Sequence, residues 1–228
     1  MIKTRILAIS FAALLIPAAI LAQGDPRPVS LMVHVDPHGN WLGFDEDHLE
    51  KGPFRMGIGG GLRMEYNFEK YYAISFGVEI NQTGGNLVHK NQVIADLTSG
   101  YDTLMPGTRL TYRLQYVEIP MAVKFMTPRI GYKRFFLETG LDLMFNTKAL
   151  IDATDNNIIK EPFQQGVGVF NVAYHVGLGF RYMFGQVLGM QAGIYYKNSF
   201  LDLTRENDIR KPDNTRLNEL GIAIGLTI

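Results

Sequence analysis

The sequence contains no cysteine among its 228 residues. This absence excludes a disulfide framework and a thiolate metal site. Charge of either sign is not in excess, because 22 lysines and arginines balance 22 aspartates and glutamates. With no basic cluster either, the charge pattern gives no support to nucleic-acid binding. Beyond the first 22 residues the chain also lacks a long apolar run, so no second segment predicts a membrane-spanning helix.

The start of the chain differs from the rest. Lys3 and Arg5 precede an apolar run that reaches Leu21, and small residues follow it. A basic start, an apolar centre and a small-residue cleavage site are typical of a secretory signal peptide. We therefore expect residues 1–23 to be a cleaved signal peptide and residues 24–228 to form one exported domain. The alternative, an N-terminal membrane anchor, is disfavoured because the apolar run is short.

Glycine, aromatic residues and a two-residue alternation dominate the rest of the chain, with 24 Gly, 14 Phe and 11 Tyr. The clearest stretch is Val117–Phe125, in which the odd positions are apolar and the even positions include Glu118 and Lys124. Successive side chains of a strand point to opposite faces, so this stretch predicts a strand with one apolar and one polar face. Pro120 cannot donate to a ladder and predicts an edge, a bulge or irregular pairing.

The same period predicts eight strands in all. They are Val29–Val35, Phe54–Tyr66, Tyr72–Asn81, Arg109–Phe125, Leu137–Asn146, Phe170–Tyr182, Leu188–Lys197 and Glu219–Ile228. Within the fourth strand the apolar phase changes between Tyr116 and Val117, which we interpret as the slip of a β-bulge. Long polar loops are expected at Asp36–Pro53, Thr83–Thr108, Thr147–Val169 and Ser199–Thr215, and they alternate with short turns.

Alternation alone does not decide which face meets water. A soluble lipocalin-like barrel would turn the apolar face inward, and a membrane barrel would turn it outward. Uncharged apolar faces about ten residues long, and alternating long and short connections, favour the membrane barrel. Aromatic residues also gather at both strand ends, as in interfacial girdles. They are Tyr66, Phe68, Tyr71, Phe125, Phe135, Tyr182 and Phe184 near the short turns, and Phe54, Tyr112, Phe145, Phe170 and Tyr196 near the long loops.

The sequence thus predicts an all-β fold, an eight-stranded antiparallel transmembrane β-barrel with up-and-down connections. With the apolar face outward, the lumen holds charged and titratable side chains. They are Arg55, Arg63, Glu65, Glu79, Arg113, Glu118, Lys124, Glu138, Asp142, His175, Arg181, Lys197 and Glu219. The lumen of an eight-stranded barrel is only wide enough to be filled by side chains. Because an unpaired buried charge is costly, these residues predict a plug of salt bridges, and a narrow gated pore is the alternative.

The sequence gives weaker support to two further kinds of site, a lipid hydrolase and a metal site. His175 on the inner face, with His34 as a possible companion, could serve a lipid hydrolase, but no Ser-His-Glu spacing identifies a nucleophile. His38 and His48 share the first long loop with acidic residues, and a solvated loop is favoured there over a metal site. We expect no catalytic residue, no metal and no cofactor.

Several segments resemble the PorT-like family of outer-membrane β-barrels from Bacteroidetes. The resemblance rests on YVEIPMAVKF at Tyr116–Phe125, FFLETGLDLMF at Phe135–Phe145, the glycine-rich FRMGIGGGLRMEY and VGLGFRYMF at Val176–Phe184. It covers essentially the whole mature chain and implies an eight-stranded barrel, with no catalytic or binding residues. One member of that family takes part in type IX secretion and gliding, and nothing in these residues ties this chain to that role.

The expected function is therefore non-enzymatic, a structural or interaction role in the outer membrane. A narrow porin-like channel for small solutes is the alternative, and a lipid-modifying enzyme comes third. Outer-membrane lipid is the expected surrounding, and other envelope proteins are expected to contact the loops, since loops on a rigid scaffold are the usual place for recognition. Trp41, Tyr101 and Met105 are the candidate contact residues, although they could equally cap the barrel mouth.

Overall fold

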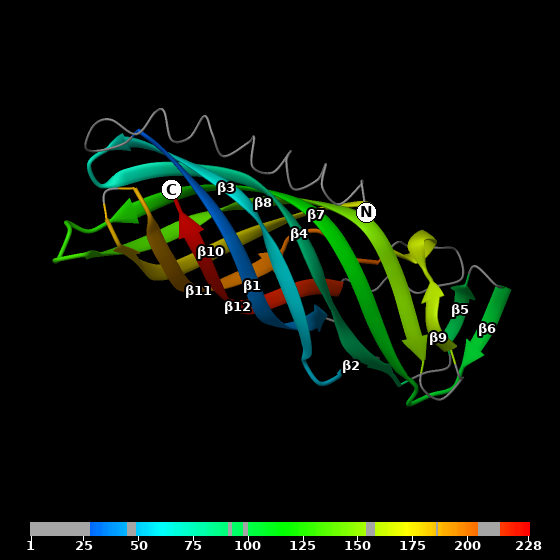
Figure 1. Cartoon of the computed structure of the whole chain (residues 1–228). Helices are drawn as coiled ribbons and strands as arrows, with labels where there is room; N and C mark the ends of the chain where they lie inside the picture. The colour runs from blue at the N-terminus through cyan, green and yellow to red at the C-terminus, as the bar shows by residue number, and fades with distance from the viewer. Residues whose placement is uncertain are drawn as a thin grey trace, which may run out of the picture.

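The computed structural model describes residues 28–44, 49–90, 93–97, 100–153, 158–185, 187–204 and 215–228. The expected signal peptide lies outside these residues. Eight long strands form the body of the molecule (Figure 1). They are β1 (Val29–Phe44), β3 (Arg55–Glu69), β4 (Tyr72–His89), β7 (Arg109–Met126), β8 (Lys133–Ala153), β10 (Phe170–Met183), β11 (Gly189–Ser199) and β12 (Thr215–Thr227).

These eight strands close into a barrel. Each pairs antiparallel with its sequence neighbours, and β1 pairs with β12, for example at His34 and Gly225, to complete the ring. The predicted eight-stranded up-and-down barrel is therefore confirmed. Both described ends of the chain lie at the end of the barrel with the short turns, where Ile228 and Leu31 exchange backbone hydrogen bonds.

Shorter elements lie at the opposite end, which we call the long-connection end. There β2 (Leu49–Lys51) pairs with β4, and β9 (Ile158–Pro162) pairs with β8. The strands β5 (Val93–Leu97) and β6 (Gly100–Leu104) form a separate hairpin, and Gln164–Gly166 is a 3-10 turn. No helix in the described part of the chain is long and apolar enough to span a membrane.

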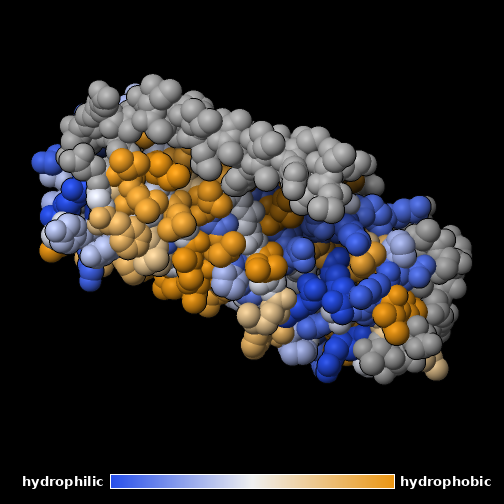
Figure 2. All heavy atoms as spheres, in the orientation of Figure 1, coloured by the Kyte–Doolittle hydropathy of each residue, from blue (hydrophilic) through white to orange (hydrophobic). Residues whose placement is uncertain are grey.

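The outward face of the barrel is apolar over a continuous belt. Alternate residues of β4 and β7 are exposed hydrophobics, from Ile74 to Ile80 and from Ile119 to Phe125, and Val117 continues the same face half-buried. Figure 2 shows this hydrophobic band with hydrophilic residues beyond it at both ends. Aromatic pairs border the belt, with Tyr72 and Phe125 ring centroids 5.7 Å apart at the short-turn end and Phe145 and Phe170 5.3 Å apart at the other. This arrangement suits a barrel surrounded by lipid.

The strands extend well beyond the belt at the long-connection end, and the prediction of long loops there was wrong in large part. Asp36–Phe44 continues β1, Thr83–His89 continues β4, and Thr147–Ala153 continues β8. On β4, β7 and β8 the polarity of the two faces is reversed above the belt, because apolar side chains point inward and polar ones outward. The outward apolar alternation that identified the strands is lost there, which explains the error on β4 and β8. On β1 the inward positions stay polar through Asn40, and the predicted strand simply ended too early.

β7 shows this reversal directly. Its buried and exposed positions alternate without a break from Leu110 to Met126, so the change of apolar phase after Tyr116 is not a slip of this strand. The predicted bulge in β7 was therefore wrong. A register shift does occur opposite this point, where Gln115 pairs with Lys148 and Tyr116 with Asn146, so that Thr147 is the extra residue of β8.

An apolar core fills the interior above the belt. Tyr112, which we expected in the outer aromatic girdle, lies inside this core and contacts Phe163 edge-on at 6.1 Å. The core consists of Leu42, Leu87, Leu110, Tyr112, Leu114, Tyr116, Met144, Ala149, Ile151, Ala153, Phe163, Val167, Ala173, Leu203 and Leu217. The interior thus has two layers, apolar at the long-connection end and charged within the belt.

Pro120 lies in the middle of β7, inside the belt. The pairing of β4 with β7 runs from Phe76–Met121 directly to Glu79–Glu118, so Ile119 and Pro120 take no part in it. Proline has no N–H to donate, which accounts for this irregular pairing in a barrel without edges.

Candidate functional site

The charged layer of the lumen is the candidate site. The structure places eleven of the thirteen residues expected there in one interior network, carried by inward positions of all eight long strands except β1. They are Arg63, Glu65, Glu79, Glu118, Lys124, Glu138, Asp142, His175, Arg181, Lys197 and Glu219. Strand alternation positions each of them, since every second side chain points into the barrel.

Glu65 anchors the short-turn end of this network. Its two carboxylate oxygens bind the Lys124 ammonium and the Arg181 guanidinium. Both cations also donate to the Gln191 side-chain oxygen, Arg181 at 2.8 Å and Lys124 at 3.3 Å. Lys124 reaches on to Glu138 at 3.0 Å. Because Glu65 and Lys124 are fully buried, neither charge has water as a partner, and each depends on the other.

Arg63 connects this group to the next. Its guanidinium donates to Glu138 at 2.7 Å and to Glu79 at 2.6 Å, thereby joining β3 to β8 across the lumen and to the adjacent β4. Glu79 lies 3.2 Å from His34 Nε2, and Asp36 lies 2.7 Å from His34 Nδ1. An arginine fork that spans two carboxylates is a strong and geometrically specific arrangement.

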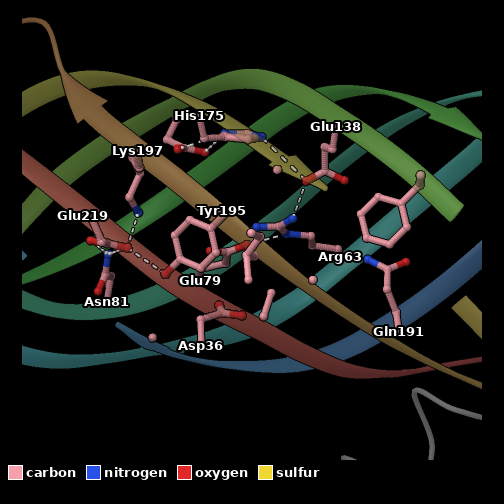
Figure 3. Close-up of a pocket in the computed structure, with 17 residues that line it drawn as sticks. Asp36, Arg63, Glu79, Asn81, Glu138, His175, Gln191, Tyr195, Lys197 and Glu219 are labelled. Carbon is pink, nitrogen blue, oxygen red and sulfur yellow. Dashed lines mark hydrogen bonds and ion pairs between the residues drawn. The ribbon is translucent and has the colours of Figure 1, made fainter. Parts of the chain in front are cut away.

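A second group lies nearer the apolar core. Lys197 binds Glu118 at 2.8 Å. It also binds Glu219 at 3.2 Å (Figure 3). The Asn81 amide donates to Glu118 at 2.9 Å and to Glu219 at 3.1 Å, and the Tyr195 hydroxyl donates to Glu219 at 2.9 Å. The Lys197 ammonium therefore holds the two carboxylates together, and the neutral donors Asn81 and Tyr195 add hydrogen bonds to them.

Asp36 and His38 also belong to this lumen, although we expected both in the first long loop. β1 continues through them, and both are buried, with His38 Nδ1 bonded to the Asp36 carbonyl at 2.8 Å. The signal that could have found them is the polar residue at every second position of β1, from His34 to Asn40. His48 and its acidic neighbours lie outside the described residues.

Arg55 and Arg113 do not join the network, and placing Arg113 in the lumen was wrong. Arg113 is on the outward face of β7, partly exposed, and pairs with Asp152 at 2.5 Å. Arg55 lies where β3 separates from β4 and donates to the Thr83 carbonyl at 2.6 Å. Both lie beyond the belt, where the faces reverse their polarity, so alternation read from the belt assigns Arg113 to the opposite face.

The charge balance of the described lumen changes accordingly. Seven carboxylates now face four permanently charged cations, since Asp36 is added and the two arginines are removed. Three histidines, His34, His38 and His175, lie among them, each within 3.6 Å of at least one carboxylate.

A small polar cavity of about 40 Å³ lies between the two groups. Asp36, Glu79, His175, Lys197 and Tyr195 are among the residues that line it (Figure 3). A cavity of this size has room for a few water molecules, because one water needs about 10–15 Å³ on this measure.

His34, Asp36 and Glu79 are close enough together to be considered as metal ligands. The two carboxylates, however, approach opposite nitrogens of the imidazole ring. A single ion bound to one ring nitrogen could not reach both carboxylates without moving the ring. The Arg63 guanidinium also occupies Glu79 at 2.6 Å. The geometry therefore fits hydrogen bonds from the imidazole better than a shared metal ion.

His175 has a similar environment. Its Nδ1 lies 3.0 Å from Asp142, and its Nε2 lies 3.6 Å from Glu138. A hydrolytic triad needs a nucleophile hydroxyl on one ring nitrogen, and here both nitrogens face carboxylates. The arrangement gives no support to a hydrolase centred on His175.

The three expected contact residues lie at different places. Trp41 is on β1 at the edge of the belt, where its ring centroid is 6.3 Å from that of Tyr196. Met105 follows β6 and is 64% exposed. Tyr101 lies in β6, and its side chain is outside the described part of the structure. Only Met105 is placed as an exposed apolar side chain beyond the belt.

Comparison with solved structures finds other small membrane barrels at low sequence identity. Neisserial surface protein A is 13% identical, with a TM-score of 0.45, covering 86% of this chain and 95% of that one. OprG from Pseudomonas aeruginosa is 12% identical, with a TM-score of 0.43, covering 88% and 94%. The Ail protein of Yersinia pestis is 13% identical, with a TM-score of 0.40, covering 87% and 98%. A search among curated proteins found no sequence match.

A family model gives the assignment. The model described as outer membrane protein beta-barrel domain matches residues 21–157, more than half of the chain. The closed barrel and its apolar belt agree with that description. The chain belongs to the outer-membrane β-barrel domain family.

Proposed function

We propose that this protein is a non-enzymatic outer-membrane barrel with a structural or interaction role, and that its lumen is plugged. Residues 1–23 direct its export and are removed. The long-connection end faces the outside of the cell, as short turns face the periplasm in outer-membrane barrels. The finer assignment to the PorT-like barrels of Bacteroidetes remains part of this proposal and rests on the sequence segments alone.

The observation that carries the proposal is the two-layer filling of the interior. Within the belt, buried ion pairs join facing walls of the barrel, as Arg63 does between Glu79 and Glu138. Above the belt, Tyr112, Tyr116 and their apolar neighbours pack into a core. A solute would have to break buried ion pairs and then cross an apolar layer. Both steps are costly. Separating a buried ion pair, or burying a polar group without a hydrogen bond, raises the free energy by several kcal/mol.

With the lumen filled, the surface beyond the belt is the part free to recognise a partner. Met105 and Ile159 are 64% and 71% exposed there. Met105 follows the β5–β6 hairpin and Ile159 lies on β9, which pairs with β8, and such residues near strand ends on a barrel scaffold suit recognition.

In-cell photocrosslinking tests the interaction role. A photoreactive amino acid at Met105 or Ile159 is expected to give a discrete protein adduct on irradiation of intact cells. The same probe at Leu141, in the middle of the belt, is expected to give lipid adducts only. Protein adducts from neither outer position, with normal assembly of both variants, would overturn the interaction role.

A narrow channel is the second candidate, and the polar cavity favours it. Asp36 Oδ1 and Asn81 Oδ1 lack a hydrogen-bond partner among the described residues, and both residues line the cavity. A continuous polar path through the lumen, of which this cavity would be one part, would conduct ions. Discrete single-channel openings are the signature that separates this candidate from a plugged barrel.

A further inference from the structure

The outward face of the barrel carries ordered polar rows directly above the belt on β4, β7 and β8. The last belt row joins Ile80, Val117 and Phe145. The next row outward is Gln82–Gln115–Lys148, followed by Gly84–Arg113–Leu150 and Asn86–Thr111–Asp152. Arg109, opposite Val88, comes one row higher. The strand register therefore places these side chains at increasing height on one side of the barrel.

The charge in these rows is mostly positive. Arg109 and Lys148 are exposed, and Arg113 is partly exposed. We call these three residues the outer basic patch. Asp152 is the one carboxylate in the described rows, and it lies above Lys148 and Arg113. Two further described acids, Glu50 and Glu161, are on the flanking short strands β2 and β9, and Glu50 lies 3.8 Å from Lys90.

The two arginines nearest the belt are held in position. Arg113 pairs with Asp152 at 2.5 Å. Arg55 donates to the Thr83 carbonyl, and its Nη1 lies 3.1 Å from where a Cβ on Gly84 would be. Gly84 has φ +140°, and its register partner on β7 is Arg113. A side chain at this position would meet the Tyr112 carbonyl oxygen at 2.0 Å before it reached Arg55, so Gly84 lets the two backbones and the Arg55 guanidinium lie close together.

The height of the patch indicates what it meets. Its lowest member, Lys148, lies one row above the apolar row of Val117 and Phe145, and Arg113 lies two rows above it, where lipid tails give way to headgroups. Basic side chains at this depth are attracted to anionic lipid. Arginine forks match the oxygen geometry of phosphate groups.

We propose that the outer basic patch binds the phosphate groups of an outer-leaflet glycolipid headgroup. The proposal rests on the orientation given under the proposed function, with the long-connection end outside. The lipid would hold the β4–β7–β8 wall at a fixed height in the membrane. Asp152 remains the counter-charge of Arg113, and Lys148 and Arg109 keep their charges available for the ligand.

The test measures binding of bisphosphorylated lipid A to the folded chain in neutral detergent micelles. The triple variant Arg109→Gln, Arg113→Gln, Lys148→Gln is expected to bind at least about tenfold more weakly, since each removed charge lowers the attraction to anionic lipid. The matched control, Lys70→Gln, Arg129→Gln, Lys133→Gln, removes the same charge from exposed positions at the short-turn end. It is expected to bind within about twofold of the parent, because those side chains lie outside the patch.

Equal weakening by both triple variants would overturn the proposal, because general electrostatic attraction would then explain binding. Unchanged binding by the patch variant would overturn it as well. Competition by inorganic phosphate at similar concentration would assign the site to free phosphate instead of lipid. Lys148→Gln alone, an exposed substitution, keeps the test valid if the triple variant fails to fold. The lumen plays no part in this assay, so its failure would leave the plugged-lumen proposal standing.

Discussion

Glu65 illustrates how single residues determine the state of the lumen. Its carboxylate holds Lys124 and Arg181, and all of its surface is buried. Two cations therefore depend on one anion in a place that water does not reach. Such a carboxylate contributes less to net stability than its contacts suggest, but its removal leaves buried charge unpaired.

Glu65→Gln is therefore expected to lower the free energy of unfolding by about 3–5 kcal/mol, the range for breaking a buried ion pair. Urea titration of the refolded barrel in detergent would measure this loss. Glu69→Gln removes the same charge from an exposed position four residues along and should change little. Equal stability of the two variants would contradict the account of the lumen.

At Gly57 the constraint is the lack of space for a side chain. A Cβ at this position would lie 2.4 Å from both His38 Nε2 and the Gln82 carbonyl oxygen. Gly57→Ala should therefore destabilise the barrel by about 1–3 kcal/mol through overpacking, as measured by the same titration. In Gly185→Ala the new Cβ meets nothing within 4 Å. Equal stability of the Gly57 and Gly185 variants would contradict this prediction, because the barrel wall would then move easily to accommodate the added methyl group.

At the scale of an element, β7 combines two environments in one strand. Its outward face meets lipid from Val117 to Phe125 and polar surroundings from Arg109 to Gln115. The sequence predicted the first half well, because apolar residues alternate strictly there. For Arg109–Gln115 it predicted the strand correctly but assigned its two faces wrongly, because the inside becomes apolar there. The same reversal hid the continuation of β4 and β8 beyond their predicted ends, and on β7 it places Arg113 outside the lumen.

Met121 and Gln115 test this division on one face of β7. Met121 lies at the centre of the belt, so Met121→Arg should reduce the stability of the inserted barrel by about 2–4 kcal/mol. Gln115→Arg, three outward positions higher, should cost about 1 kcal/mol or less, as at an interface. Unfolding from lipid vesicles would measure both. A similar cost at the two positions would contradict the assignment of the belt.

At the scale of the whole molecule, the sequence period predicted the fold and most residues of the lumen, but not the contacts that these residues make. The strand period decides which side chains share a face, and eleven of the lumen residues were found in this way. It does not decide how far each strand extends or which charges meet. Asp36 and His38 were missed because β1 was ended too early, and this omission concealed the surplus of carboxylates that the three histidines face.

Single-channel recording of the refolded mature chain in a planar bilayer is the most direct test of the plugged barrel. A folded, inserted barrel is expected to remain silent, because the ion pairs of Arg63 and Lys197 and the apolar core close the interior. Discrete, voltage-stable openings would contradict the account, above all if Glu118→Lys or Arg181→Glu changed their ion selectivity.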